Sequence, residues 1–126
     1  MRETERESTT LVAESTPSLN LIFDLLSNRC RRYVLYYLYD QPDGVATIED
    51  VADHVVVLEM QETGADTEVS ADERSHDVRV ELQHVHLPKL EDAGIIELDR
   101  RSETVRYWTQ PSLEEWLEHA KHKELS

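Results

Sequence analysis

The chain has 126 residues, of which 27 are acidic and 13 are lysine or arginine, so its formal net charge is −14. This length supports one compact domain with short tails rather than two separate cores. No apolar run approaches the roughly 20 residues of a membrane-spanning helix, and the acidic start lacks the plan of a signal peptide. We therefore expect a cytoplasmic protein without membrane contact. A single cysteine, Cys30, excludes a disulfide within one chain and a zinc knuckle built on several cysteines.

The negative charge opposes binding to another polyanion, because affinity for DNA normally comes from lysine and arginine. Only three basic residues are lysine, namely Lys89, Lys121 and Lys123, and acidic residues occur in nearly every segment. This pattern is typical of adaptation to a cytoplasm with molar salt. In such salt the Debye length is about 3 Å, so distant acidic groups are screened and only close contacts count. The acidity weakens a DNA-binding interpretation without excluding it.

The chain begins with a segment, residues 1–15, that is polar, mixed in charge and without periodicity, which predicts a disordered acidic tail. Thr16 is the expected cap of a first helix near residues 18–26, with Pro17 in the first turn, where its missing N–H costs nothing. Apolar residues at helical spacing are expected to form the inward face of this helix: Leu19, Ile22, Phe23 and Leu26.

A second helix is predicted near residues 28–40, capped by Ser27 or Asn28. Its core-facing residues Val34, Leu35 and Leu38 are surrounded by four tyrosines, at positions 33, 36, 37 and 39. Such a ring of aromatic side chains favours a packing or subunit-contact surface over a base-stacking platform.

Cys30 lies in the same helix between Arg29 and Arg31. The two cations would favour its thiolate, as in a redox sensor. A small buried residue is the simpler interpretation, because free cysteine is among the most often buried residue types.

A turn at residues 42–44 leads to a short strand, Val45 to Thr47, which we expect to join a later hairpin as a third member. Thr47 and Asp50 form a capping box that opens a helix near residues 47–62, and Gly64 closes it. The connection from Gly64 to Ser70 is longer than the turn of a tight helix-turn-helix, which has roughly 3 to 4 residues.

Ser70 and Glu73 form a second capping box at the start of a long helix, residues 71–93. Pro88 predicts a kink or a restart near Leu87, because it cannot donate to the preceding turn, and His86 is expected to fix that kink. Gly94 is expected to end the helix as a left-handed C′ residue.

The pattern then alternates with a period of two, which predicts a β-hairpin near residues 95–109. Its inward residues would be Ile96, Leu98, Val105 and Tyr107. The connection lacks the Asn-Gly signal of a tight hairpin, so the turn type is left open. Arg100 and Arg101 lie at its tip.

The last segment, residues 111–126, is predicted to form a C-terminal helix near 112–122 that begins with a capping box of Ser112 and Glu115. Trp116 is expected to pack against the first helix or against the same helix of a second subunit. Together with the tyrosine-rich helix this apolar surface predicts a homodimer through the following residues: Tyr33, Tyr37, Leu113, Trp116, Leu117 and Ala120.

The order of these elements resembles the winged helix-turn-helix fold. Three phrases, IFDLLSNRCRRYVLYYL (22–38), TIEDVADHV (47–55) and HLPKLEDAGIIELD (86–99), more narrowly resemble a family of haloarchaeal winged-helix domains that is broadly ArsR-like. Members of that family are mostly described as predicted transcriptional regulators. The resemblance covers roughly residues 17–109. It implies a mainly α domain with a small β-hairpin over residues 16–110, a halophilic archaeal host and a DNA-binding regulator.

A helix followed at once by a hairpin with a basic tip suits reading a groove with the helix while the tip touches phosphate. The expected contacts to double-stranded DNA come from the 71–93 helix and the 95–109 wing: Arg74, Arg79, Gln83, His84, Lys89, Arg100, Arg101 and Arg106. Asp77 and Glu81 lie within the same helix and oppose this interpretation. The alternative is a protein-interaction module on the same scaffold, without direct DNA binding. A continuous basic strip favours DNA, and acidic interruption favours protein.

No sequence motif of a hydrolase triad, a phosphate loop or a zinc protease is present, so we expect neither an enzyme nor a cofactor. His119 and His122 share a face of the last helix and would be able to chelate a metal ion. No third ligand accompanies them at a fixed spacing. We therefore expect no metal site.

Overall fold

The computed structural model describes residues 17–63 and 71–125, which are mainly helical with one small antiparallel sheet. The predicted tail (1–15), Thr16 and the segment from Gly64 to Ser70 with its capping box lie outside the described residues. The elements follow in this order: α2 (Leu19–Leu26), α3 (Arg29–Asp40), β1 (Val45–Thr47), α4 (Ile48–Thr63), α5 (Ala71–Glu81), the π-helical turn η1 (Leu82–His86), α6 (Leu87–Asp92), β2 (Ile96–Asp99), β3 (Thr104–Tyr107) and α7 (Pro111–Leu125).

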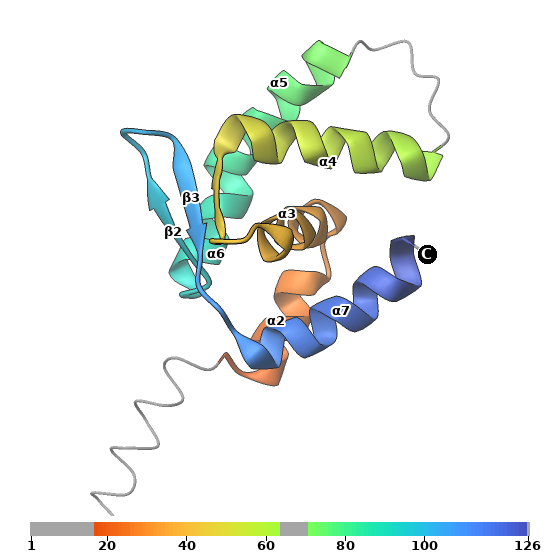
Figure 1. The fold of residues 1–126 in the computed structure, drawn as a ribbon, viewed down its shortest axis with the longest axis vertical. Helices are drawn as coiled ribbons and strands as arrows, with labels where there is room; N and C mark the ends of the chain where they lie inside the picture. Colours follow the sequence, from red (N-terminus) through yellow and green to blue (C-terminus); the bar gives the residue numbers. More distant parts are fainter. Residues whose placement is uncertain (1–16, 64–70, 126) are drawn as a thin grey trace, which may run out of the picture.

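Helix α3 is the centre of the core, with α4 on one side and α2 and α7 on the other (Figure 1). Because neighbours cover it nearly all round, Tyr33, Val34, Leu35 and Leu38 are completely buried. Apolar residues of α4, the π turn, the sheet and α7 complete one contiguous cluster. The buried tyrosines of α3 are therefore packing residues of the core.

Polar side chains cap the starts of three helices. Asn28 Oδ1 accepts from the Arg31 N–H at 3.1 Å, and Thr47 Oγ1 accepts from the Asp50 N–H at 3.0 Å, as the sequence predicts. The cap of α2 is Ser18, whose Oγ accepts from the Leu21 N–H at 3.1 Å, so the assignment to Thr16 is wrong.

The capping box expected at Ser112 and Glu115 is also wrong, because α7 begins at Pro111. Glu114 takes the role instead: its Oε2 accepts from the Gln110 N–H at 3.1 Å and from the Tyr107 hydroxyl at 2.7 Å. Pro111 sits in the first turn, where a missing N–H leaves no bond unmade.

The segment predicted as one long helix is divided by the π turn η1. The Leu87 N–H donates to the carbonyl of Leu82, five residues back. Pro88 explains this turn, since it has no N–H and its ring would clash with the carbonyl of His84 in a regular helix. A wide turn brings residues five apart toward one side, so Leu82 and Leu87 are both completely buried. The kink predicted at Leu87 is confirmed in this form.

The sheet has the order β1-β3-β2, so Val45–Thr47 joins the hairpin as predicted. Gly44, just before β1, has φ +71°, and a Cβ there would lie 2.8 Å from the Tyr107 carbonyl oxygen, which leaves room only for glycine. Gly94 ends α6 with φ +79°, as expected.

The turn of the hairpin, left open by the sequence, is held by Asp99, whose Oδ1 accepts from the N–H groups of Arg101 at 3.0 Å and Ser102 at 3.3 Å. Glu103 takes a positive φ of 55° before β3 begins. Its carbonyl accepts from the Ile48 N–H at 2.9 Å, which ties the hairpin to the start of α4.

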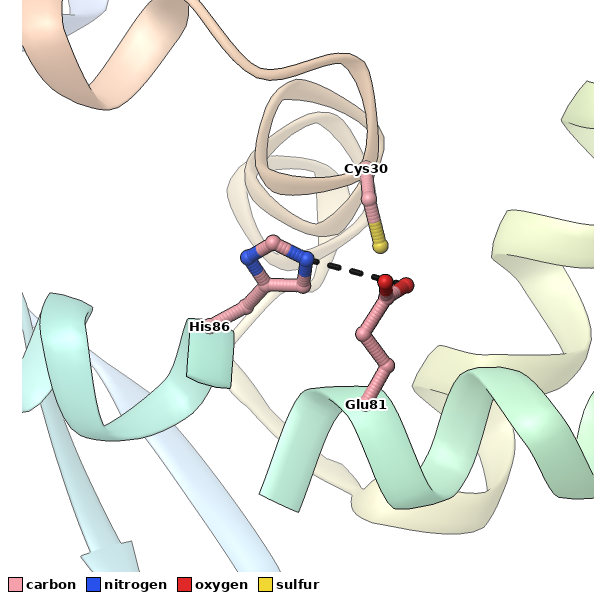
Figure 2. A group of neighbouring side chains, drawn as sticks. All are labelled: Cys30, Glu81 and His86. Atoms are coloured by element: carbon pink, nitrogen blue, oxygen red, sulfur yellow. Dashed lines mark ion pairs between the residues drawn. The ribbon is translucent and has the colours of Figure 1, made fainter. Parts of the chain in front are cut away.

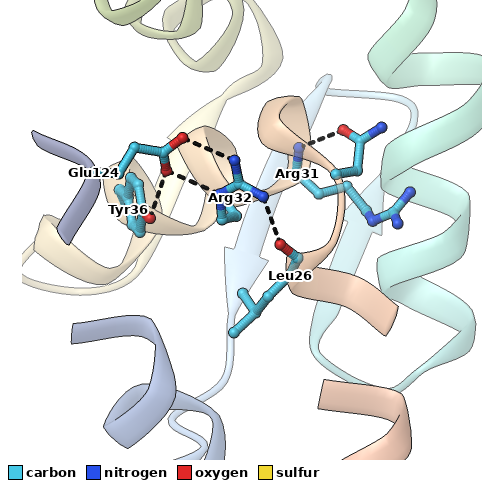
Figure 3. Close-up of polar contacts among 6 residues, drawn as sticks. Leu26, Arg31, Arg32, Tyr36 and Glu124 are labelled. Atoms are coloured by element: carbon cyan, nitrogen blue, oxygen red, sulfur yellow. Dashed lines mark hydrogen bonds and ion pairs between the residues drawn. The ribbon is translucent and has the colours of Figure 1, made fainter. Parts of the chain in front are cut away.

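Helix α7 is held to α3 by a polar clamp (Figure 3). Arg32 donates from Nε and Nη2 to the two carboxylate oxygens of Glu124, each at 2.8 Å, and the Tyr36 hydroxyl donates to Glu124 at 2.9 Å. Arg32 also donates to the carbonyl of Leu26 at 2.7 Å, which includes the end of α2. The hydrogen bond from Arg32 holds the pKa of Glu124 below its usual value.

Replacing Glu124 by glutamine should destabilise the fold by about 1–2 kcal/mol, because Arg32 loses a charge-assisted bidentate partner that is only partly exposed. Glu115→Gln is the matched control, since it removes the same charge from an exposed position of the same helix. Denaturant unfolding followed by circular dichroism at pH 7 measures both. Equal stabilities of the two variants would contradict the clamp.

The stability that Glu124 contributes should decrease as the pH falls. A carboxylate whose pKa is lowered in the folded state contributes stability above its unfolded pKa, 4.5 here, and loses that contribution as the pH falls through the lower folded value. The difference in unfolding free energy between the wild type and Glu124→Gln should be full at pH 7 and shrink below pH 4.5.

Candidate nucleic-acid interface

Helix α5 and the π turn present one continuous outward face. Exposed residues recur in pairs every four positions, which places them along one side of the helix. Within it Val80 is 43% exposed and Val85 is 51% exposed, although both are apolar. The face is otherwise acidic and histidine-rich: Asp72, Glu73, His76, Asp77, Glu81 and His84.

The arginines predicted to read DNA from this helix lie at the border of that face. Arg74 is half-buried and donates from Nε and Nη2 to the carboxylate of Glu59 on α4, at 3.0 and 3.1 Å. Arg79 is half-buried and has no ion pair within the described part of the chain. His84 is exposed, as its assignment requires.

Gln83 and Lys89 lie in different surroundings. Gln83 lines a shallow hollow with Leu98 and Arg100 of the hairpin, so the structure brings two of the predicted DNA contacts together. Lys89 instead pairs with Asp24 of α2 at 3.0 Å. Its ammonium is thus already matched by a carboxylate on another helix.

The wing, meaning strands β2 and β3 with their connection, carries the other three arginines. Arg100 is 66% exposed at its side chain and pairs with Glu91 at 3.2 Å. Arg101 is exposed, and its backbone N–H donates to Asp99 Oδ1 at 3.0 Å. The guanidinium carbon of Arg106 lies 5.3 Å from the centre of the Trp108 ring, a cation–π arrangement.

Arg100 and Arg106 line one hollow of about 540 Å³ on the outer surface of the hairpin, together with Glu97 and Asp99. Glu97 is also the cross-strand neighbour of Arg106. The wing therefore gathers cations in the described structure, but acids accompany Arg100 and Arg106. The eight predicted residues do not form one uninterrupted basic strip.

The prediction of the subunit interface needs correction. Tyr33, Leu113 and Leu117 are completely buried within one chain, so they have no surface to offer a partner, and their assignment to an interface is wrong. Tyr37 is half-buried, with its ring 4.5 Å from that of His54, and Ala120 is half-buried.

Trp116 packs against the first helix, one of the two predicted arrangements. Its ring meets Phe23 edge to face with 5.1 Å between centroids. Ile22 is buried as expected, but Leu19 and Phe23, also expected to face the core, are 52% and 47% exposed, because α2 turns Leu25 to the core. With Trp116 at 39%, they form an exposed apolar patch over α2 and α7 that the sequence did not show as a surface.

Cys30 is buried, which confirms the simpler expectation for it. Burial, followed by repulsion from Glu81 and Glu59, raises the pKa of its thiol to about 12. The thiolate needed for a redox sensor is thus disfavoured, and the side chain of Arg31 donates to the carbonyls of Leu25 and Asp24.

Metal-ligating side chains gather at one place among the residues that the structure describes, and it is not the pair on the last helix. Cys30, Glu81 and His86 bring a sulfur, an oxygen and a nitrogen within 4.8 Å of one another. His119 and His122 join no such group of three in residues 17–63 and 71–125. In the same residues no helix has the length and apolar character needed to cross a membrane.

A family model, described as a domain of unknown function (DUF7344), matches residues 23–106. The chain belongs to the DUF7344 family. Its matched span in this member runs from α2 through the helices and strands to β3, so α7 lies beyond it. Neither the search of curated proteins nor the search of solved structures found a match for this DUF7344 chain.

Proposed function

We propose that this DUF7344 protein is a DNA-binding transcriptional regulator with a winged helix-turn-helix fold. The observation that carries the proposal is topological. Helix α3, strand β1, two helices α4 and α5 packed on each other, and a hairpin that pairs with β1 follow in the order of a winged helix. In that arrangement the second helix of the pair enters the major groove and the hairpin lies beside it. The acidic composition supports a halophilic archaeal host and a cytoplasmic protein.

The wing supplies the contacts to the DNA backbone in this proposal. Arg100 and Arg101 stand at its tip, and an arginine keeps its charge and grips phosphate with two N–H groups. The pair between Arg100 and Glu91 is no obstacle, because an exposed ion pair contributes at most about 1 kcal/mol and exchanges readily for a phosphate.

The outward face of α5 and the π turn supplies the base contacts. His84 on this face and Gln83 beside the hairpin offer polar groups to base edges, and the exposed Val80 and Val85 match the methyl group of thymine. A carboxylate such as Asp77, exposed on this face, accepts from the amino group of cytosine but repels phosphate. This chemistry favours specific sites over general affinity for DNA.

A second candidate function is a protein-interaction module on the same scaffold. It is favoured by the ion pairs that already occupy Arg74, Lys89 and Arg100, and by the exposed valines on an acidic helix face. A protein partner would cover the valines without needing free cations. Substitution of the wing residues Arg100 and Arg101 distinguishes the two functions.

Replacing Arg100 and Arg101 together by alanine should weaken binding to every duplex alike and lower the salt slope by about one for each phosphate that the wing no longer binds. The thermal unfolding temperature should change little, because both side chains are exposed. Fluorescence anisotropy with labelled duplexes across a potassium chloride series measures affinity and slope.

The matched control replaces Lys121 and Lys123 on α7 by alanine, which removes the same charge far from the wing (Figure 1). It should keep the wild-type slope. An unchanged affinity and slope in the Arg100 and Arg101 variant would show that the wing does not contact DNA and would favour the protein-interaction module.

We also propose that the protein acts as a homodimer, in which a second copy covers the apolar patch of Leu19, Phe23 and Trp116. Two-fold proteins match palindromic DNA sites, and a patch of large exposed apolar side chains marks an interaction site. The patch lies on α2 and α7 (Figure 1), so it leaves the wing and α5 outside the contact.

Light scattering coupled to size exclusion in high salt should give the mass of a dimer for the wild type. Phe23→Ser with Trp116→Ser should give a monomer, and Trp108→Ser, which changes a tryptophan 47% exposed near the wing, should remain a dimer. A wild-type monomer at micromolar concentration would end the dimer proposal.

A further inference from the structure

Three side chains of different chemistry meet behind the π turn (Figure 2). Cys30 comes from the first turn of α3, Glu81 from the last residue of α5, and His86 from the end of η1. Their sulfur, oxygen and nitrogen atoms all lie within 4.8 Å of one another. The π turn creates this meeting, because it is the segment between Glu81 and His86.

His86 is the second observation that points to a ligand. Its side chain is 4% exposed, and its Nε2 is buried without a hydrogen-bond partner in the described structure. Glu81 Oε1 lies 3.7 Å from this nitrogen, beyond hydrogen-bond length. Figure 2 draws this contact as an ion pair, which requires a protonated imidazole, whereas burial lowers the pKa of His86 and so favours the neutral ring. A buried polar atom without a partner costs free energy that a bound ion would recover.

The donor set indicates which ion. A thiolate, an imidazole nitrogen and a carboxylate oxygen are the three ligand types that zinc takes, whereas magnesium and calcium prefer oxygen alone. We propose that Cys30, Glu81 and His86 bind one Zn²⁺ ion, with water in the fourth position. Glu81, half-exposed at its side chain, gives the site its opening to solvent.

Binding requires small movements and one proton release. Each ligand atom of a tetrahedral zinc ion lies about 2.0 to 2.3 Å from the metal, so the ligand atoms lie closer to one another than they do here. The exposed Glu81 side chain is free to move toward the other two ligands. The Cys30 thiol gives its proton to solvent as the zinc–sulfur bond forms.

The neutral imidazole must also present its lone pair at Nε2. Arg31 Nη1 lies 3.4 Å from His86 Nδ1, and an arginine can only donate. The imidazole proton therefore sits on Nε2 without metal and moves to Nδ1 when zinc binds. The Arg31 contact lengthens in response, while its guanidinium stays bound to the carbonyls of Leu25 at 3.0 Å and Asp24 at 2.9 Å.

The charges around the site are compatible with a divalent cation. The Cys30 thiolate and the Glu81 carboxylate neutralise zinc, and Glu59 adds a further negative charge near Cys30, partly offset by Arg74 and Arg31. Bound zinc would connect α3 to both sides of the π turn. It would thus hold the π turn in place as well as the three ligand side chains.

The test is titration of the full chain with Co²⁺, a spectroscopic substitute for zinc. Cys30 is the only cysteine, so thiolate-to-cobalt charge-transfer absorption reports this site alone, whatever the acidic surface binds. We expect the band to saturate at one equivalent and to disappear on addition of Zn²⁺. Cys30→Ser should abolish the band.

Glu81→Gln keeps a partly exposed position and should fold, and it should weaken Zn²⁺ binding, measured by competition against cobalt, about tenfold or more. His84→Ala is the matched control, since His84 is exposed in the same turn and should leave the band and the affinity unchanged. Absence of the band in folded wild-type protein, or equal affinities of wild type and Glu81→Gln, would overturn the site.

Discussion

The break in the helix at Pro88 is the constraint on which the rest of the structure depends. Because proline cannot continue a regular helix, the chain widens into a π turn, and the bond from Leu87 to Leu82 replaces the ordinary one. The turn keeps Leu82 and Leu87 in the core and places His86 behind α3. It also directs α6 toward Gly94, after which the wing begins at Ile96. The proposed DNA surface and the proposed zinc site are therefore both arranged around this one turn.

Local patterns predicted the fold well where the physical cause is local. The caps at Asn28 and Thr47, the kink before Pro88 and the left-handed Gly94 each depend on neighbours within a few residues. Prediction failed where distant residues decide. Glu114 displaces Ser112 at the start of α7 because Tyr107 and Gln110 both donate to it. Leu19 and Phe23 have helical spacing, but α2 turns Ile22 and Leu25 to the core, and spacing alone does not fix that rotation.

The candidate sites were predicted less completely for the same reason. The sequence identifies the arginines, but their partners come from other elements: Glu59 for Arg74, Asp24 for Lys89 and Glu91 for Arg100. In a chain with a charge of −14, a cation meets a carboxylate almost wherever it lies. Spacing within one helix drew attention to His119 and His122, whereas Cys30, Glu81 and His86 meet only after α3 and the π turn have packed.

Amide hydrogen exchange tests most directly our proposal that the α5 face and the wing together contact DNA. The full chain would first select duplexes from a random pool in potassium chloride, and exchange would then be compared with and without a selected duplex. Contact with DNA through these elements should slow exchange in residues 76–86 and 97–106, with no change in α2 and α7. Failure to enrich any duplex, or protection confined to α2 and α7, would contradict it.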